Sequence, residues 1–337
     1  MDERWTPRPT AEHNMSGASC PRPARGGMPE EAVDVVVILA IAIACTIGGA
    51  SGGAAGLAMA ILFALASVIA IVYLRFDPHI THTANGFALI RTRRMRDGSL
   101  ARVFRQGGVY QSATYLDGRR FEPVFAYQRA FDIVFDLEGQ KFERTGRGVV
   151  DVLALGGGGY AWPKHALMSH DNLHMDVVEI DEAVTRAARR WFFVDELEVR
   201  AGDRLHIITA DGRAYLEGER DAGRYDAIVN DTFSGHEPVL ALATVEAARA
   251  VRSLLAPGGL YVANVVSHEG GTELTFLRDT AATLRQVFAR VWIVPATDEQ
   301  FDGEDNYLVI ASDEPYAVVG SIPFDEEFLG TPMTDAA

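Results

Sequence analysis

The second half of the chain alternates short apolar runs with amphipathic segments. Apolar runs of strand length lie at 149–155, 175–180, 205–210, 225–231 and 258–266, and two more follow at 290–296 and 306–312. Near-continuous apolar runs are typical of strands that are covered on both faces of a sheet. Segments with helical periodicity separate them, at 161–170, 181–192, 239–255 and 273–288. This alternation predicts a doubly wound, mostly parallel sheet of seven strands, an α/β fold.

The preceding segments have a different texture. Residues 83–147 contain short alternating runs broken by Gly and Asp, which predict a small antiparallel β domain. Residues 1–32 are rich in Pro, Gly and charge, and we expect a disordered tail there. The predicted Rossmann-like domain then occupies 148–315, and 316–337 form a C-terminal tail.

One apolar block stands apart from the rest, since residues 35–74 contain no charged side chain. A single membrane span needs about 20 apolar residues, so the pattern predicts two transmembrane helices within 33–74 with a turn at the glycines of 48–53. A signal peptide or a buried helix pair fits the length and purity of this block less well. Arginines on both flanks predict that both ends, and with them the α/β domain, lie on the cytoplasmic side of the cell membrane.

Composition narrows the possible partners. The formal net charge of −15 argues against nucleic acid, because nucleic-acid binding uses basic surfaces. The acidity is compatible with a cationic substrate, although it is also the common consequence of a soluble surface. Cys20 and Cys45 are the two cysteines, and their contexts favour neither a disulfide nor a zinc site. The histidines are scattered, and no metal is expected.

A glycine-rich loop directly follows the first strand of the predicted sheet. Gly156, Gly158 and Ala161 satisfy the G-x-G-x-x-A spacing, which brings backbone amides at a helix N-terminus close to a ligand. Glu179 ends the second strand, and a carboxylate there can accept hydrogen bonds from two ribose hydroxyls. These features predict a nucleoside site, and a dinucleotide would require the same two.

A third acid distinguishes between these ligands. Asp211 and Gly212 end the third strand, where the carboxylate is placed to accept from an adenine amino group. Dinucleotide sites do not require such an acid, so the pattern favours an S-adenosylmethionine-type ligand.

Asp231 ends the fourth strand, next to a Gly-His-Glu-Pro loop. A carboxylate in this position can orient a nucleophile and accept its proton. Glu237 in the following loop is a candidate contact to the substrate. The alternative is that Asp231 caps the helix expected at 239–255.

Residues 84–312 resemble the spermidine synthase (polyamine aminopropyltransferase) family. The resemblance rests on four motifs in the same order: GGVYQSATYLDGRRFEPVFAYQRAF, LALGGGGYAW with DVVEID, ITADGRAYL and YDAIVNDTFSG. It implies a class I S-adenosylmethionine-dependent methyltransferase fold and a transferase whose donor is decarboxylated S-adenosylmethionine. Carried over by position, Asp231 is catalytic, Tyr127 and Gln128 line the substrate pocket, and the nucleoside is bound by Gln111, Gly156, Gly158, Glu179, Asp211 and Gly212.

The chain departs from the family pattern at two places. Gly159 and Tyr160 replace an Asp-Gly pair in the glycine loop, and Ser234 replaces the second acid after Asp231. Because ionised hydrogen bonds are the strong ones, both losses weaken the expected recognition of a diamine. A glycine at 159 also leaves room for a methionine carboxylate. Aminopropyl transfer to an amine, methyl transfer from S-adenosylmethionine and a non-catalytic membrane-tethered binding protein therefore stay open, with a homodimer as one possible state.

Overall fold

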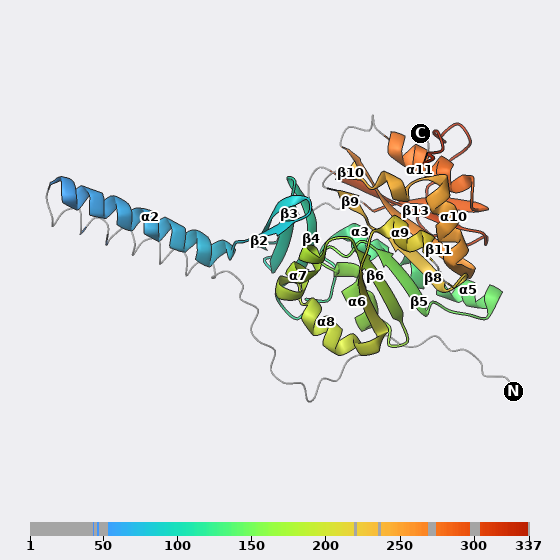
Figure 1. The fold of residues 1–337 in the computed structure, drawn as a ribbon, viewed down its shortest axis with the longest axis horizontal. Helices are drawn as coiled ribbons and strands as arrows, with labels where there is room; N and C mark the ends of the chain where they lie inside the picture. The colour runs from blue at the N-terminus through green and yellow to red at the C-terminus, as the bar shows by residue number, and fades with distance from the viewer. Residues whose placement is uncertain are drawn as a thin grey trace.

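The computed structural model describes residues 43, 46, 53–218, 221–234, 237–268, 274–296 and 304–335. Within these residues, a long helix leads into a small antiparallel sheet, which is followed by a large α/β body (Figure 1).

The α/β body is built on a seven-stranded sheet with the order β12-β13-β11-β8-β5-β6-β7. Its strands are β5 (Asp151–Leu155), β6 (His174–Glu179), β7 (Leu205–Thr209), β8 (Tyr225–Asn230), β11 (Leu255–His268), β12 (Arg290–Pro295) and β13 (Glu304–Ser312). Strand β13 is antiparallel to both neighbours, whereas the other neighbouring pairs are parallel. The predicted Rossmann-like methyltransferase fold, with a mostly parallel sheet of seven strands, is therefore confirmed.

Helices cover both faces of this sheet and bury two separate apolar cores. One face carries α6 (Ala161–Ser169), α7 (Glu182–Trp191) and α8 (Val194–Ala201), the last followed by the short turn η1 (Gly202–Arg204). The other carries α9 (Gly212–Glu217), α10 (Val245–Leu254) and α11 (Thr275–Arg285). Alternate residues of one strand supply opposite cores: Leu153 and Leu155 face the second core, and Val152 and Ala154 face the first.

The segment after Asp231 differs from the sequence prediction. The expected helix over 239–255 begins only at Val245, where the Thr244 side chain accepts from the Ala247 amide at 3.2 Å. Before it come two short strands, β9 (Phe233–Ser234) and β10 (Glu237–Pro238), and the 3-10 turn η2 (Leu240–Leu242). The helix cap is therefore Thr244, and the alternative role of Asp231 as an N-cap is wrong.

A four-stranded antiparallel sheet precedes the α/β body. It consists of β1 (His79–Thr83), β2 (Gly86–Arg94), β3 (Leu100–Gln106) and β4 (Val109–Tyr115) in sequential order. Three short helices connect it to the body: α3 (Ala126–Ala130), α4 (Ile133–Asp136) and α5 (Glu138–Thr145). Strand pairing starts at His79, before the predicted beginning of this domain at 83. The buried ion pair between Lys141 Nζ and Asp226 Oδ1, at 2.8 Å, fastens α5 to the start of β8.

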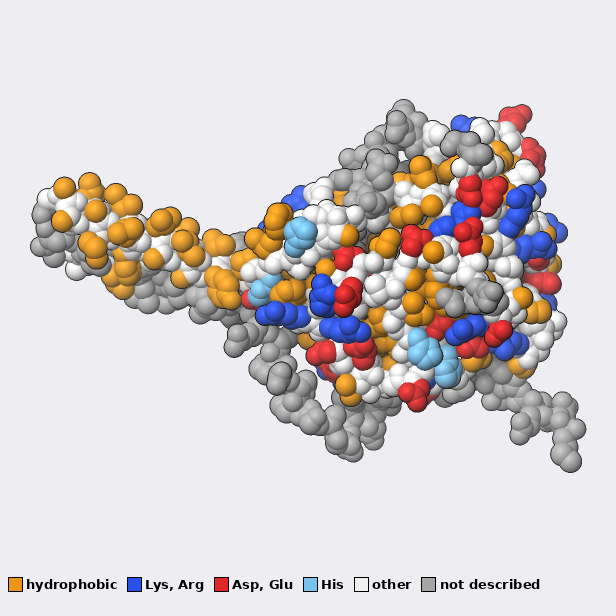
Figure 2. All heavy atoms as spheres, viewed as in Figure 1, with side chains coloured by type: hydrophobic (Ala, Val, Ile, Leu, Met, Phe, Trp, Pro, Cys, Tyr) orange, Lys and Arg blue, Asp and Glu red, His pale blue; other side chains and the backbone are white. Residues whose placement is uncertain are grey.

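Helix α2 (Ala54–Phe76) projects away from the body, and Figure 2 shows hydrophobic side chains along its length. Its segment 54–73 has a mean hydropathy of 2.6 and only 6% of it is buried inside the structure, so it is long and apolar enough to cross a membrane. The first of the two predicted spans and the predicted tail 1–32 fall outside the described residues. At the other end of the chain, 316–335 lies against the body, where Asp335 pairs with Arg213.

Candidate active site

A cavity of about 180 Å³ opens at the carboxyl edge of the parallel strands, where α/β proteins bind ligands. Its walls come from the glycine loop after β5, the ends of β6 and β8, the segment before α9, and β4 and α3 of the preceding region. Nine of the ten predicted site residues line it: Gln111, Tyr127, Gln128, Gly156, Gly158, Glu179, Asp211, Gly212 and Asp231. The side chain of the tenth, Glu237, lies outside the described part of the structure.

The glycine loop is pressed against the end of β8. Gly156 has φ +91°, and a Cβ on it would lie 2.4 Å from the carbonyl oxygen of Asp231. Two backbone hydrogen bonds of 2.9 Å hold this arrangement, from Gly156 N to Val178 O and from Asp231 N to Leu155 O. Only glycine satisfies both the backbone conformation and the close approach, so the loop and the acid are positioned as one unit.

Glu179 holds the glycine loop as well as facing the cavity. Its Oε2 accepts from the amides of Gly157 at 2.9 Å and Gly158 at 3.0 Å, and its Oε1 accepts from Asp181 N at 3.0 Å. From the sequence, Glu179 was expected to contact only the ribose hydroxyls of a nucleoside, whereas the structure shows that it also binds the loop amides. A ribose diol would share a carboxylate that already orients the loop, which couples loop geometry to nucleoside binding.

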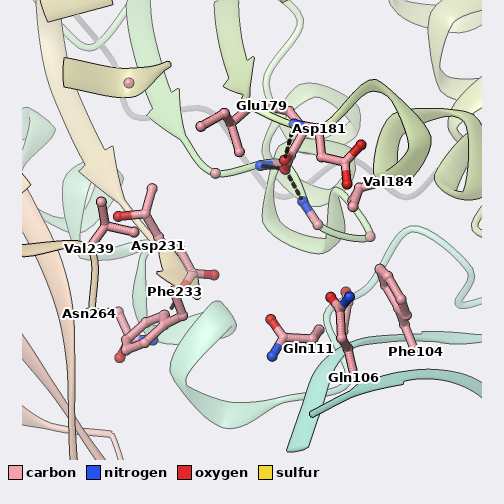
Figure 3. A pocket seen from close by; sticks show the side chains of 18 of the residues that line it. Phe104, Gln106, Gln111, Glu179, Asp181, Val184, Asp231, Phe233, Val239 and Asn264 are labelled. Carbon is pink, nitrogen blue, oxygen red and sulfur yellow. Dashed lines mark hydrogen bonds between the residues drawn. The ribbon is translucent and has the colours of Figure 1, made fainter. Parts of the chain in front are cut away.

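Asp211 combines a structural role with its place in the cavity wall. Its Oδ1 accepts from Ala214 N at 2.8 Å and so caps α9. The cap fixes the carboxylate of Asp211, which lines the same cavity as Glu179. Gln111 faces the cavity from the opposite wall, in β4 (Figure 3). The register between β3 and β4 shifts at this residue, and such bulges redirect side chains beside functional sites.

The second half of the glycine loop corrects one sequence expectation. A Cβ on Gly159 would lie 2.3 Å from Ser112 Oγ and 3.0 Å from a ring carbon of Phe192, so the space expected there for a ligand carboxylate is filled by protein. Tyr160 adopts φ +54° as the N-cap of α6, and its buried hydroxyl pairs with Thr185 Oγ1 at 2.9 Å. The tyrosine ring packs beneath Gly157, and this packing offsets the strain of a non-glycine residue in the left-handed region.

Asp231 lies at the other end of the cavity, half-buried between two polar side chains. Asn264 on β11 donates from Nδ2 to Asp231 Oδ1 at 2.9 Å, and the Tyr127 hydroxyl also hydrogen-bonds to the carboxylate. Burial raises the pKa of Asp231 to about 6, and the hydrogen bonds from Asn264 and Tyr127 oppose this rise. The carboxyl therefore titrates close to neutral pH, as a general base requires.

Asn264 is the site residue that the sequence analysis missed. Strand β11 pairs in parallel with β8, and Ala263 lies opposite Asn230, so the residue after each lies at the cavity edge. The sequence signal for this role is that Asn264 is the one polar residue inside the apolar run YVANVV of 261–266. Among the described residues, no group of three or more His, Cys, Asp or Glu side chains is placed to hold a metal ion.

The fold and the loop after β5 define a Rossmann-like protein of the class I methyltransferase type. The spermine/spermidine synthase domain model matches residues 145–299, so this segment of the chain is similar to the spermine/spermidine synthase family. A solved structure of a probable spermidine synthase from Corynebacterium glutamicum superposes with a TM-score of 0.56 at 22% identity, over 71% of this chain and 81% of that one, which shows the shared fold.

Two kinds of curated relative are similar to the chain. Polyamine aminopropyltransferase 2 of Hyperthermus butylicus is 30% identical over 145 residues, which are 42% of this chain and 45% of that protein. The eEF1A lysine and N-terminal methyltransferase of Danio rerio is 32% identical over 148 residues, which are 42% of this chain and 21% of that protein. The chain thus spans less than half the length of either relative.

Proposed function

We propose that the protein is a transferase that moves an aminopropyl group from decarboxylated S-adenosylmethionine to an amine, with Asp231 as the base. The observation that carries this proposal is the position of Asp231. Its carboxylate, with a pKa near 6, shares one cavity with the glycine loop, Glu179 and Asp211, the set suited to an adenosine. The match to the spermine/spermidine synthase model and the aminopropyltransferase relatives support the same reaction.

The charge of the cavity wall supports a donor without a carboxylate. Four acids line the cavity, Glu179, Asp181, Asp211 and Asp231, and its described lining contains no Lys or Arg. An anionic methionine tail would meet this acidic wall without a cationic partner, whereas the decarboxylated donor carries only positive groups.

The proposed chemistry needs no group beyond these side chains and the two substrates. The amine nitrogen attacks the propyl carbon bonded to the sulfonium, a C–N bond forms, the C–S bond breaks and neutral 5′-methylthioadenosine leaves. The ammonium form of an amine has a pKa near 10 and must lose one proton for this attack. Asp231 accepts that proton. Its pKa of about 6 lies closer to the pKa of the ammonium than the 3.8 of an ordinary aspartate does, so the proton transfer is less unfavourable.

Methyl transfer from S-adenosylmethionine is the second candidate function. The similarity to the eEF1A methyltransferases favours it, because their identity to this chain is comparable to that of the aminopropyltransferase relatives. The family aspartate missing at 159 favours it as well, since the loop then carries one negative charge fewer. A non-catalytic binding protein is the third reading, and the cluster of Glu179, Asp211 and Asp231 around one cavity weighs against it.

Calorimetric titration of the protein with the two donors distinguishes these functions. The account predicts that decarboxylated S-adenosylmethionine binds at least tenfold more tightly, about 1.4 kcal/mol, because the acidic wall repels the second donor's carboxylate. Tighter binding of S-adenosylmethionine would support methyl transfer, and binding of neither donor would support the non-catalytic reading.

We further propose that the apolar segment anchors the enzyme to the cell membrane, with the α/β body on the cytoplasmic side. The apolar and exposed surface of α2 supports this proposal. Removal of residues 1–76 should move the protein from the pelleted membrane fraction to the soluble fraction. A truncated protein that still sediments with membranes would contradict the anchor.

A further inference from the structure

The small sheet that follows α2 is basic, although the protein as a whole is acidic. Its strands β1–β4 contain neither Asp nor Glu, whereas the whole chain has a formal net charge of −15. The arginines of these strands are Arg91, Arg93, Arg94, Arg102 and Arg105. A surface of this kind attracts an anionic partner.

The two faces of this sheet differ because successive side chains of a strand point to opposite sides. Ala88, Ile90 and Phe104 lie on the inner face and pack into the first core of the α/β body. The outer face of β1 and β2 therefore looks away from the body. With the neighbouring position of β3, this outer face carries Ile80, His82, Phe87, Leu89, Arg91, Arg93 and Arg105.

The apolar part of the outer face is open to solvent. Ile80 and Phe87 are 71% and 74% exposed, which is unusual for large apolar side chains. Strand pairing places Leu89 between Ile80 and Arg105, and the four side chains line an open hollow of about 450 Å³. Apolar side chains that are exposed together and bordered by charge mark an interaction surface.

The arginines beside this hollow keep their positive charge. Arg105 is exposed, and its Nε donates to the neutral Gly108 carbonyl at 2.9 Å. The Cζ atoms of Arg105 and Arg93 lie 5.7 Å and 5.5 Å from the ring centre of Tyr110. These contacts hold the guanidinium groups in place and contribute no negative charge. A guanidinium fork held in this way can bind a phosphate group through two hydrogen bonds.

A fixed joint connects this sheet to α2. Asp77 ends the helix, and its carboxylate lies 2.9 Å from Arg102 Nη2 and 3.1 Å from His79 Nε2. Arg102 also donates to the carbonyl of Trp191 at 3.2 Å, and the His79 ring stacks on the Trp191 ring. The end of α2 is thus tied to β3 and α7, so the helix fixes the placement of the outer face.

The proposed membrane span brings the outer face to the level of lipid headgroups. Figure 1 shows the small sheet between α2 and the α/β body, so its outer face is on the side of the helix. Figure 2 shows hydrophobic and basic side chains next to each other where α2 joins the body. Ile80 closely follows the apolar segment 54–73, and an extended chain adds only about 3.5 Å per residue. The headgroup layer itself is about 5–8 Å thick.

We propose that the outer face of β1 and β2 is a docking surface for the anionic phospholipids of the leaflet that α2 enters. Its arginines bind the phosphates, and Ile80 and Phe87 enter the border between headgroups and acyl chains. This inference rests on the proposed membrane anchor and is independent of the group that the enzyme transfers. A second copy of the chain fits this face less well, because a symmetric dimer would bring the arginines of both copies together.

The test follows a fluorescent label on the outer face of the full-length protein. An environment-sensitive dye is attached to His82→Cys in a Cys20→Ser, Cys45→Ser background, since His82 is exposed and lies opposite Phe87. The protein is inserted into vesicles of phosphatidylcholine with or without phosphatidylserine. With phosphatidylserine, we expect dye emission to shift to shorter wavelength and quenching by nitroxide-labelled lipid to increase about threefold or more.

Matched variants separate lipid contact from general effects. A dye on Val319→Cys, which is 85% exposed in the C-terminal segment, should not respond to phosphatidylserine. Phe87→Ser with Arg105→Gln should remove most of the response of the His82→Cys protein and leave its melting temperature nearly unchanged, because both side chains are exposed. Arg249→Gln, the same loss of charge on α10, should leave the response intact.

Flotation of the same vesicles separates the docking surface from the anchor. Failure of the protein to float with phosphatidylcholine vesicles overturns the anchor and this inference together. Stable insertion with equal emission and quenching in both kinds of vesicle overturns the docking surface alone. A response that fades when the protein is diluted among more vesicles indicates contact between two copies and also overturns it.

Discussion

Asp231→Asn is expected to lower turnover by about 10²–10⁴-fold, the usual contribution of a general base, while nucleoside affinity stays within about twofold. The amide cannot accept the proton of the attacking amine, but it keeps the shape of the side chain and an oxygen that accepts from Asn264. Initial rates at saturating donor and amine, with calorimetry of the same samples, give both values. Unchanged turnover would remove Asp231 from the mechanism.

The same substitution is expected to stabilise the protein at neutral pH. Folding raises the pKa of Asp231 from 3.8 to about 6, so the folded state binds more protons than the unfolded state between these values. Stability is therefore lost as pH rises through this window. Above pH 6 the ionised carboxylate lowers the free energy of unfolding by at most about 3 kcal/mol, and solvent screening of this half-buried side chain makes the loss smaller. Asp231→Asn should raise the melting temperature at pH 8 and leave it nearly unchanged at pH 3.5. Destabilisation at pH 8 would show that burial of this charge is not costly.

The pH dependence of the wild-type enzyme follows from the same group. The base acts in its ionised form, so kcat/KM should rise with pH and level off above about 6. This limb should be missing from the residual activity of Asp231→Asn.

Gly156→Ala is expected to have the largest effect on stability in the glycine loop. The new methyl group would lie 2.4 Å from the Asp231 carbonyl oxygen, a backbone atom that can move only with the end of β8. The residue would also hold a positive φ, which costs about 1–2 kcal/mol by itself. Together we expect a loss of at least about 3 kcal/mol in the free energy of unfolding, and weakened donor binding because the loop and Asp231 separate.

Gly158→Ala is the matched control for this prediction. Gly158 also has a positive φ, +51°, but its nearest neighbour to an added Cβ is Gln111 O at 3.9 Å. It should lose only the backbone strain of about 1–2 kcal/mol. Chemical denaturation of the two variants measures the difference, and equal losses would mean that the contact between Gly156 and β8 carries no energy.

The sequence predicts the α/β body well because the central strands β5, β6 and β8 are buried on both faces and helices such as α7 and α10 are amphipathic. The acids at strand ends, Glu179, Asp211 and Asp231, could be located for the same reason, since the carboxyl ends of parallel strands meet at one edge. Their separate chemical roles in catalysis stay predictions.

What the sequence could not show depends on contacts between distant segments. Glu179 accepts a hydrogen bond from the glycine loop, and Asn264 donates one to Asp231. Both bonds join residues more than 20 positions apart in the sequence. The space at Gly159 is filled by Ser112, from a strand that precedes it by three helices. The helix start at Val245 is set by the Thr244 cap, which competes with an apolar periodicity that begins at 239.

The identity of the nucleoside released during turnover tests the central claim most directly. Incubation of the protein with decarboxylated S-adenosylmethionine and a primary amine should release 5′-methylthioadenosine in equal amount to the aminopropylated amine, detected by chromatography and mass spectrometry. The same incubation with S-adenosylmethionine should release no S-adenosylhomocysteine. Release of S-adenosylhomocysteine with a methylated amine, and no 5′-methylthioadenosine from the first incubation, would contradict the account.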